Sequence, residues 1–201
     1  MYSLILDTSN RTLGVALVSR NRIVDSISFE AFRKQSELLI PEIKKLLTRN
    51  DLELSVIRKI YVSNGPGSYT GIRMSLAVAK TLAFANEVKI YLVSSLLAQV
   101  GYTELPTVSI IDARANRVYF GFFQGGLPLQ EEMVLTLEEA KAFIEKLGDI
   151  DVISNSPLEL FLNQSNSPKD GIIGISEVLK FQKSIKDPLR VEPFYFKDAV
   201  V

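Results

Sequence analysis

The segment NGPGSYTGIR, residues 64–73, places three glycines and a proline directly before a long apolar run. Glycine-rich turns before helices often hold phosphate, because the first backbone N–H groups of a helix have no partner within it. The spacing fits neither common nucleotide motif. Five residues separate Gly65 from Gly71, no Lys follows Gly71 directly, and Thr70 stands where a dinucleotide fingerprint needs its third glycine.

Two interpretations of this turn stay open. In the first, the glycines turn the chain and Ser68 or Thr70 caps the following helix by accepting a backbone N–H bond. In the second, the start of the helix holds an anion or a group from a partner, with the help of Arg73. The residues of the turn that starts this helix are Gly65, Gly67, Ser68, Thr70 and Gly71.

A second candidate set follows the first apolar segment, where Asp7, Thr8 and Ser9 could bind Mg²⁺ and phosphate. Residues 109–123 repeat the pattern of residues 4–18, so that Asp112 aligns with Asp7. Either any two β-hairpins look alike, or the chain is duplicated and the two Asp turns face one another across a cleft. No glycine follows Asp112 directly, so a backbone has no means of close approach to a phosphate there. The set would form a degenerate nucleotide site.

Composition excludes several kinds of chemistry. The chain has no histidine and no cysteine, which removes His- or Cys-dependent nucleophiles, His- or Cys-ligated zinc and thiol redox chemistry. We expect no metal and no cofactor. Its 23 Lys and Arg balance 23 Asp and Glu, so there is no overall attraction to nucleic acid. The N-terminus lacks the pattern of a signal peptide, and no run reaches the about 20 apolar residues of a membrane span, so we expect a cytoplasmic protein with no membrane partner.

Hydrophobic patterning predicts the elements that position these residues. Strands are expected at 2–7, 13–20, 22–30, 59–64, 89–94, 107–113, 117–123 and 128–135, and helices at 36–47, 70–85 and 137–147. Pro41 should lie in the first turn of its helix. Gly125 and Gly126 are expected to form a hairpin turn. Residues 102–106 are the expected boundary between two halves.

The helix after the glycine turn is apolar on nearly all sides, since its four polar residues between 72 and 85 form no continuous face. Such a helix is buried within the protein or covered by another chain, and we favour a protein interface. The expected interface residues are Ile72, Arg73, Leu76, Ala79, Lys80 and Ala83.

Four blocks together resemble the bacterial TsaB family, also called YeaZ-like: LILDTS, GPGSYTGIRMSLAVAKTLA, IIDAR with RVYFGFF, and EPFYFKDAV. The resemblance implies an α/β, two-lobed, duplicated fold of the actin, hexokinase and Hsp70 type (ASKHA, ribonuclease H-like). It implies an N-terminal lobe at 1–102, a smaller C-terminal lobe at 103–189, and a tail of about 190–201 that packs on the first lobe. Gln35 stands where the family often has a histidine.

The resemblance also implies a role in making threonylcarbamoyladenosine next to the anticodon of tRNAs that read ANN codons. In that family the protein is not the catalyst. It pairs with the catalytic paralogue TsaD, is joined by the ATPase TsaE, contacts tRNA indirectly and forms homodimers in isolation, using the helix after the glycine turn. Two alternatives remain: a free-standing Mg²⁺-ATP-dependent ATPase or kinase that uses Asp7 and Asp112, and a module that binds tRNA directly.

Overall fold

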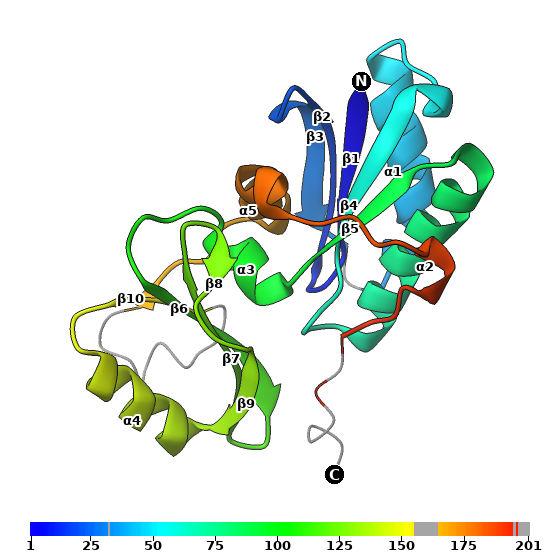
Figure 1. Cartoon of the computed structure of the whole chain (residues 1–201). Coiled ribbons are helices and arrows are strands. Elements are labelled where there is room, and N and C mark those ends of the chain that lie inside the picture. Colours follow the sequence, from blue (N-terminus) through cyan, green and yellow to red (C-terminus); the bar gives the residue numbers. More distant parts are fainter. Residues whose placement is uncertain (32, 155–164, 195, 197–201) are drawn as a thin grey trace.

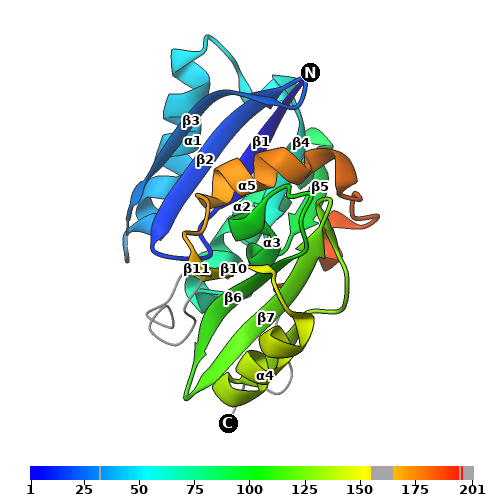
Figure 2. The same cartoon turned by 90° about the vertical axis from the view of Figure 1, so that its left-hand side faces the viewer.

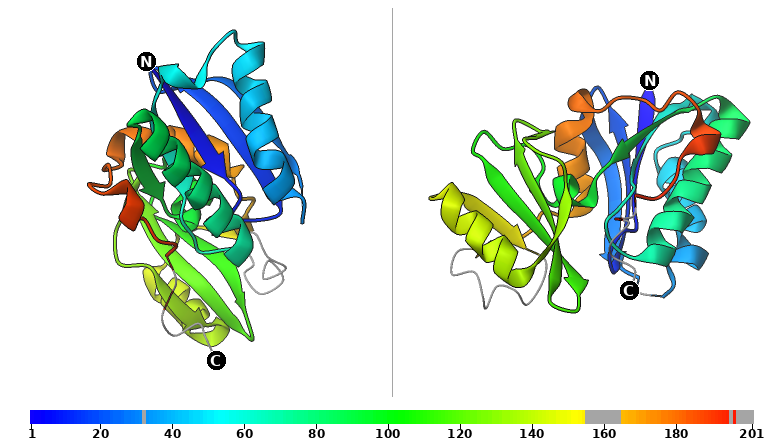
Figure 3. Two further views of the ribbon diagram at one scale, coloured as in Figure 1. Left: turned by 90° about the vertical axis from the view of Figure 1, so that its right-hand side faces the viewer. Right: turned by 60° about the horizontal axis from the view of Figure 1, so that its bottom comes forward.

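The structure, a computed structural model, describes residues 1–31, 33–154, 165–194 and 196. It contains two mixed β-sheets with helices on both faces of the first and on the outer face of the second (Figure 1). Figure 2 shows α3 and α5 between the two sheets, and Figure 3 shows α4 on the far side of the second sheet. The predicted mixed α/β class is confirmed.

The first sheet has the strand order β3-β2-β1-β4-β5. The chain opens as an antiparallel meander of β1 (Tyr2–Asp7), β2 (Thr12–Ser19) and β3 (Arg22–Glu30), and then adds β4 (Ile57–Ser63) and β5 (Lys89–Val93) in parallel. Arg20 and Asn21, both with positive φ, form the tight turn between β2 and β3. The expected meander with Asn21 at its turn is therefore confirmed.

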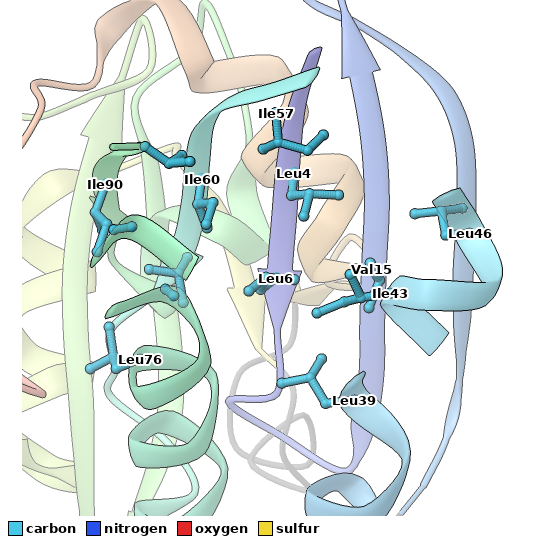
Figure 4. Close-up of a cluster of buried hydrophobic side chains, with 14 of the residues drawn as sticks. Leu4, Leu6, Val15, Leu39, Ile43, Leu46, Ile57, Ile60, Leu76 and Ile90 are labelled. Carbon is cyan, nitrogen blue, oxygen red and sulfur yellow. The ribbon is translucent and has the colours of Figure 1, made fainter. Parts of the chain in front are cut away.

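Two helices cover one face of this sheet, α1 (Gln35–Arg49) and α2 (Tyr69–Asn86). Their apolar stripes meet β1, β2 and β4 in a core of aliphatic side chains (Figure 4). The predicted stripe of Leu39, Ile43, Leu46 and Leu47 is buried, as expected. Pro41 is a correction, because it lies inside α1 and not in its first turn. The position is exposed, which places the missing N–H of Pro41 on the solvent side of the helix.

The second sheet repeats the opening of the first. The β6–β7 hairpin (Thr107–Arg114 and Arg117–Gln124) is followed by β10 (Asp151–Ser154), which pairs in parallel with β6 as β4 pairs with β1. The sheet is completed by β8 (Leu127–Pro128), β9 (Met133–Thr136) and β11 (Ser165–Asn166), and α4 (Leu137–Leu147) covers it. Gly125 and Gly126, with φ of 62° and 76°, form the expected turn between β7 and β8.

Three features differ from the sequence predictions. The segment 128–135 is not one strand, because residues 129–132 leave the sheet between β8 and β9. Two helices were not predicted, α3 (Ser95–Val100) and α5 (Gly171–Val178). Both are short. The helix α3 is buried along its whole length, and α5 buries four of its eight residues and exposes the apolar Ile173, so neither shows the polar face that marks an amphipathic helix in a sequence.

The described part of the chain also contains the short 3-10 helices η1 (Leu54–Val56), η3 (Leu179–Phe181) and η4 (Pro188–Arg190). The end of the chain returns to the first sheet, where Val191 is buried in the α1–α2 core and the Phe194 backbone N–H donates to the Asn64 carbonyl. Half of the predicted tail and most of the EPFYFKDAV block lie outside the described residues. The two sheets occupy residues 2–93 and 107–166; the exact lobe boundaries stay a prediction.

Candidate functional site

The glycine turn before α2 packs directly on the turn after β1. A Cβ atom at Gly67 would overlap the Ser9 carbonyl, and one at Gly71 would overlap the Thr8 carbonyl. The Ser68 backbone N–H donates to the Ser9 carbonyl at 2.7 Å, and the Thr8 hydroxyl donates to the Gly71 carbonyl at 2.8 Å. The two candidate sets are thus brought together, and the glycines are needed for close approach of the chain to itself.

The first interpretation of the turn agrees with its geometry. Ser68 is the N-cap of α2, and its hydroxyl accepts from the Gly71 N–H at 3.2 Å, while Thr70 lies inside the helix. Gly65 has a φ of 113°, and a Cβ atom there would be 2.9 Å from the Phe194 carbonyl oxygen. Its own carbonyl accepts from the Ser95 N–H. The turn joins β4, α2 and α3 through backbone contacts.

Asp7 is buried and already surrounded by protein groups. One carboxylate oxygen, Oδ1, accepts from the Ser63 hydroxyl at 2.5 Å and from the Ser9 N–H at 3.0 Å. The other, Oδ2, faces the first residue of α5, where a Cβ atom on Gly171 would overlap it. The pocket that remains beside Asp7 measures about 60 Å³, whereas sites for small molecules typically measure about 300–1,000 Å³. The start of α5 therefore closes off Asp7 Oδ2, and the space left beside Asp7 is much smaller than a typical small-molecule site.

Asp112 does not join Asp7. It is exposed at the end of β6, its Oδ1 accepts from the Arg114 N–H at 2.7 Å, and it does not line the pocket beside Asp7. The expectation that two Asp turns face one another across a cleft is therefore corrected: the aligned hairpins exist, but α3 and α5 lie between the sheets. Among the described residues, no group of three or more Asp or Glu side chains could hold a metal ion.

The helix α2 presents its two faces differently. Four of the expected interface residues lie on the inner face, where they pack on the first sheet and are at most 4% exposed: Ile72, Leu76, Ala79 and Ala83. Leu76 is among the core side chains in Figure 4. The expectation that these side chains meet a partner is corrected, because the sheet of the same chain covers them. A charge introduced there would unfold the protein rather than test an interface.

The outer face of α2 is apolar as well. Together with α1 and the segment after it, this face forms an open groove of about 480 Å³. Lys44, Thr48, Glu53 and Thr81 are the polar residues of its lining, and the rest are apolar: Ile40, Ile43, Leu47, Leu52, Leu54, Ala77, Val78 and Leu82. Ile40 is 62% exposed, and Phe84 nearby on α2 is 78% exposed. We call this surface the α1–α2 groove.

Arg73 and Lys80 do not line this groove. On a helical projection they follow Tyr69 along one edge of α2, and the Arg73 guanidinium donates to the Tyr69 hydroxyl at 2.9 Å and lies over its ring. They remain at the surface, so they are the two expected interface residues that a partner could reach.

Sequence reasoning missed three contributors to this region. Gln35 is buried, and its amide donates to the carbonyls of Asn10 and Thr12, which ties α1 to the β1–β2 turn. Gly171 and Gly174 let α5 approach Asp7 and α3, and the two glycines of the GIIG segment are the signal that could have identified this close packing.

No helix in the described part of the chain is long and apolar enough to span a membrane.

Comparison with known proteins decides the family. The family model described as "TsaD: tRNA N6-adenosine threonylcarbamoyltransferase" matches residues 29–143. The Bacillus subtilis protein named "tRNA threonylcarbamoyladenosine biosynthesis protein TsaB" is 38% identical over 137 residues, which are 67% of this chain and 60% of that protein. The chain belongs to the TsaB (YeaZ-like) family. The predicted family is therefore confirmed.

Two further relatives extend the match along the chain. An uncharacterised protein of Mycoplasma genitalium is 29% identical over 203 residues, covering 99% of this chain and 96% of that protein. The solved structure of YeaZ from Pseudomonas aeruginosa superposes with a TM-score of 0.77 at 24% identity, over 97% of this chain and 99% of that one. This likeness confirms the predicted fold. The chain spans 60% of the length of the B. subtilis TsaB that it matches.

Proposed function

We propose that this TsaB-family chain acts in the biosynthesis of threonylcarbamoyladenosine in tRNA, as a non-catalytic partner of a TsaD protein in a complex that also recruits TsaE. The main support for a non-catalytic role is that the Asp7 carboxylate is enclosed by Ser63, Ser9 and the start of α5. A pocket of about 60 Å³ leaves no room for a nucleotide. The names of the relatives support the pathway.

The α1–α2 groove is the surface that we assign to the TsaD partner. Monomeric proteins rarely expose extended apolar surface between two helices without a partner to cover it. The groove is open and apolar, and the exposed Ile40 side chain forms part of its lining. Its shape suits the apolar face of a helix that packs into the space between α1 and α2. A second copy of this chain would use the same surface in a homodimer.

A charge at the centre of the groove tests this assignment without disturbing the core. Ala77 and Thr81 are exposed on the outer face of α2, so Ala77→Glu places a carboxylate in the groove and keeps the helix. Ala142→Glu is the matched control, because Ala142 is also an exposed helical alanine, on α4. The purified chain is mixed with a TsaD protein, and the mass of the mixture is measured by light scattering.

We expect a heterocomplex with the unsubstituted chain and with Ala142→Glu, and its loss with Ala77→Glu. A desolvated, unpaired carboxylate in an apolar interface costs several kcal/mol, which is a loss of affinity of more than a hundredfold. No heterocomplex with any form of the chain would overturn the proposed function. Equal complex formation by Ala77→Glu and Ala142→Glu would overturn the assignment of the groove.

A further inference from the structure

Lysine side chains lie next to one another at one end of the first sheet. The strand register pairs Ser3 of β1 with Lys59 of β4, and Lys59 with Lys89 of β5. Register partners project on the same face of a sheet, so Lys59 and Lys89 are direct neighbours. Neighbouring like charges destabilise a sheet unless an anion compensates them.

The segment after α5 brings a third lysine to this edge of the sheet. Ser184 forms an antiparallel bridge with Tyr91, and the Ile185 N–H donates to the Ile90 carbonyl at 2.9 Å, so the segment runs beside the outer edge of β5. Figure 1 shows it passing β5 on its way from α5 to α2. Lys186 follows two residues after Ser184, where the chain bends, and it is exposed. We call Lys59, Lys89 and Lys186 the lysine strip.

Aromatic rings lie directly below the strip. Tyr61 and Tyr91 form the next pair in the register and stack with their centroids 4.6 Å apart, and the Lys59 ammonium lies 5.6 Å from the Tyr91 centroid. Nearby, Lys180 lies over Phe181, which stacks on the exposed ring of Tyr102. Tyr61 is buried and Tyr91 is half-buried, whereas Tyr102 is exposed, so Tyr102 is the ring of this set on which a base of single-stranded nucleic acid could stack.

Two acidic groups in this region already have other partners. Glu177 accepts from Lys169 and from the Tyr102 N–H, and Asp187 pairs with Arg190. Among the described residues, no salt bridge includes Lys59, Lys89 or Lys186. The chain as a whole has equal numbers of acidic and basic residues, so this positive charge is a local feature.

We propose that the lysine strip binds the phosphate backbone of RNA. The proposal deepens the proposed function, on which it rests for the choice of RNA among polyanions. A row of flexible ammonium groups contacts phosphates without reading sequence, so the strip would position the RNA and leave its recognition to the partner. It differs from the indirect contact implied by family resemblance, because this chain itself touches the RNA.

The test measures the salt dependence of RNA binding. The full chain is mixed with the TsaD protein, and its binding to a labelled anticodon stem-loop RNA is followed by fluorescence anisotropy at several salt concentrations. The double variant K59Q/K89Q is compared with K141Q/K146Q, which removes two lysines from α4 on the second sheet. Thermal melts confirm that both variants fold, since Lys59 also packs on Tyr91.

Each phosphate contact contributes about 0.7–0.9 to the slope of log affinity against log salt concentration. We expect K59Q/K89Q to reduce this slope by about 1.5 and to weaken binding at low salt, with similar effects on RNAs of different sequence. K141Q/K146Q should leave the slope unchanged. Equal slopes for the two variants, or no RNA binding at all, would overturn the proposal, as would equally strong competition by polyglutamate, which would indicate an acidic protein partner instead.

Light scattering of the chain mixed with the TsaD protein shows whether the heterocomplex forms, and this separates failure of the RNA-binding proposal from failure of the proposed function. If the heterocomplex forms while K59Q/K89Q binds RNA with an unchanged slope, the lysine strip is refuted and the partner function stands. If K59Q/K89Q reduces the slope but no heterocomplex forms, the RNA surface stands and the partner function is refuted.

Discussion

The contact between Asp7 and Gly171 gives the most direct test of the packing that leaves so little space beside Asp7. Gly171 is the first residue of α5, and a Cβ atom there would overlap Asp7 Oδ2 and lie 2.7 Å from Asp7 Cγ. The same atom would lie 3.4 Å from Asp7 Cβ, which is ordinary van der Waals contact. Gly171→Ala therefore clashes with the carboxylate alone, and Asp7→Ala should relieve the clash.

The size of the expected destabilisation follows from how tightly Gly171 and Asp7 are packed. Forcing one extra methyl group into a well-packed site costs about 1–3 kcal/mol, because α5 must shift between two packed sheets. Asp7→Ala costs about 1–3 kcal/mol on its own, since the Ser63 hydroxyl and the Ser9 N–H lose their acceptor. In the Asp7→Ala background Gly171→Ala should be neutral or stabilising by up to about 1 kcal/mol, because alanine in a helix has less freedom to lose on folding than glycine.

Urea unfolding of the four proteins of this double-mutant cycle measures the coupling. We expect a coupling free energy of about 2 kcal/mol, with Gly171→Ala destabilising only when Asp7 is present. A cost of Gly171→Ala that is the same in both backgrounds, within about 0.5 kcal/mol, would show that α5 does not pack on the carboxylate. The account of why this site excludes nucleotides would then fail.

Three further predictions follow from the same structure. Burial raises the pKa of Glu132 to about 7, although a hydrogen bond with the Ser94 hydroxyl partly opposes the shift. As the pH rises, Glu132 therefore loses its proton in the unfolded state before it does so in the folded state. The free energy of unfolding should fall between about pH 4.5 and pH 7 by at most about 3 kcal/mol. Glu132→Gln should remove this loss of stability. Urea unfolding should then find the variant more stable than the unsubstituted chain at pH 8 and about as stable near pH 4. Equal stability of the two proteins at both pH values would contradict the raised pKa of Glu132. Leu76→Ala should lower the free energy of unfolding by about 2–5 kcal/mol in the same assay, because the Leu76 side chain is only 2% exposed and lies in the core. A decrease below about 0.5 kcal/mol would place Leu76 at the surface instead. Calorimetry with Mg²⁺-ATP should detect no binding to the isolated chain, and micromolar binding that Asp7→Ala abolishes would instead support the ATPase alternative.

Much of the fold could be predicted because its signals are local. The β1–β3 meander, α2 and α4 were all expected within about two residues of their bounds, and α4 even carries a capping box of Thr136 and Glu139. The elements that were missed depend on tertiary packing. The helix α5 has the sequence GIIGISEV, whose glycines disfavour a helix in isolation, and it is stabilised by burial against α3 and β1.

The candidate site was predicted only in part, for a related reason. Spacing excluded the two phosphate motifs, and the residue types of the turn left Ser68 and Thr70 open as the helix cap, of which the structure shows Ser68. Hydrophobicity alone could not distinguish the inner face of α2 from its outer face, because Leu76 and Val78 are equally apolar in the sequence. Only the position of α1 beside α2 shows that Leu76 contacts the sheet and that Val78 lines the groove.

The alternation of side chains along β4 connects the two proposed surfaces. Ile60 and Val62 point to the core under α1 and α2, whereas Lys59 and Tyr61 point to the opposite face, toward α5. The α1–α2 groove and the lysine strip therefore lie on opposite sides of one sheet. A partner seated in the groove leaves the strip open, and RNA on the strip leaves the groove open. Under the two proposals, one chain holds a protein and an RNA at the same time, as the proposed partner role in a tRNA-modifying complex requires.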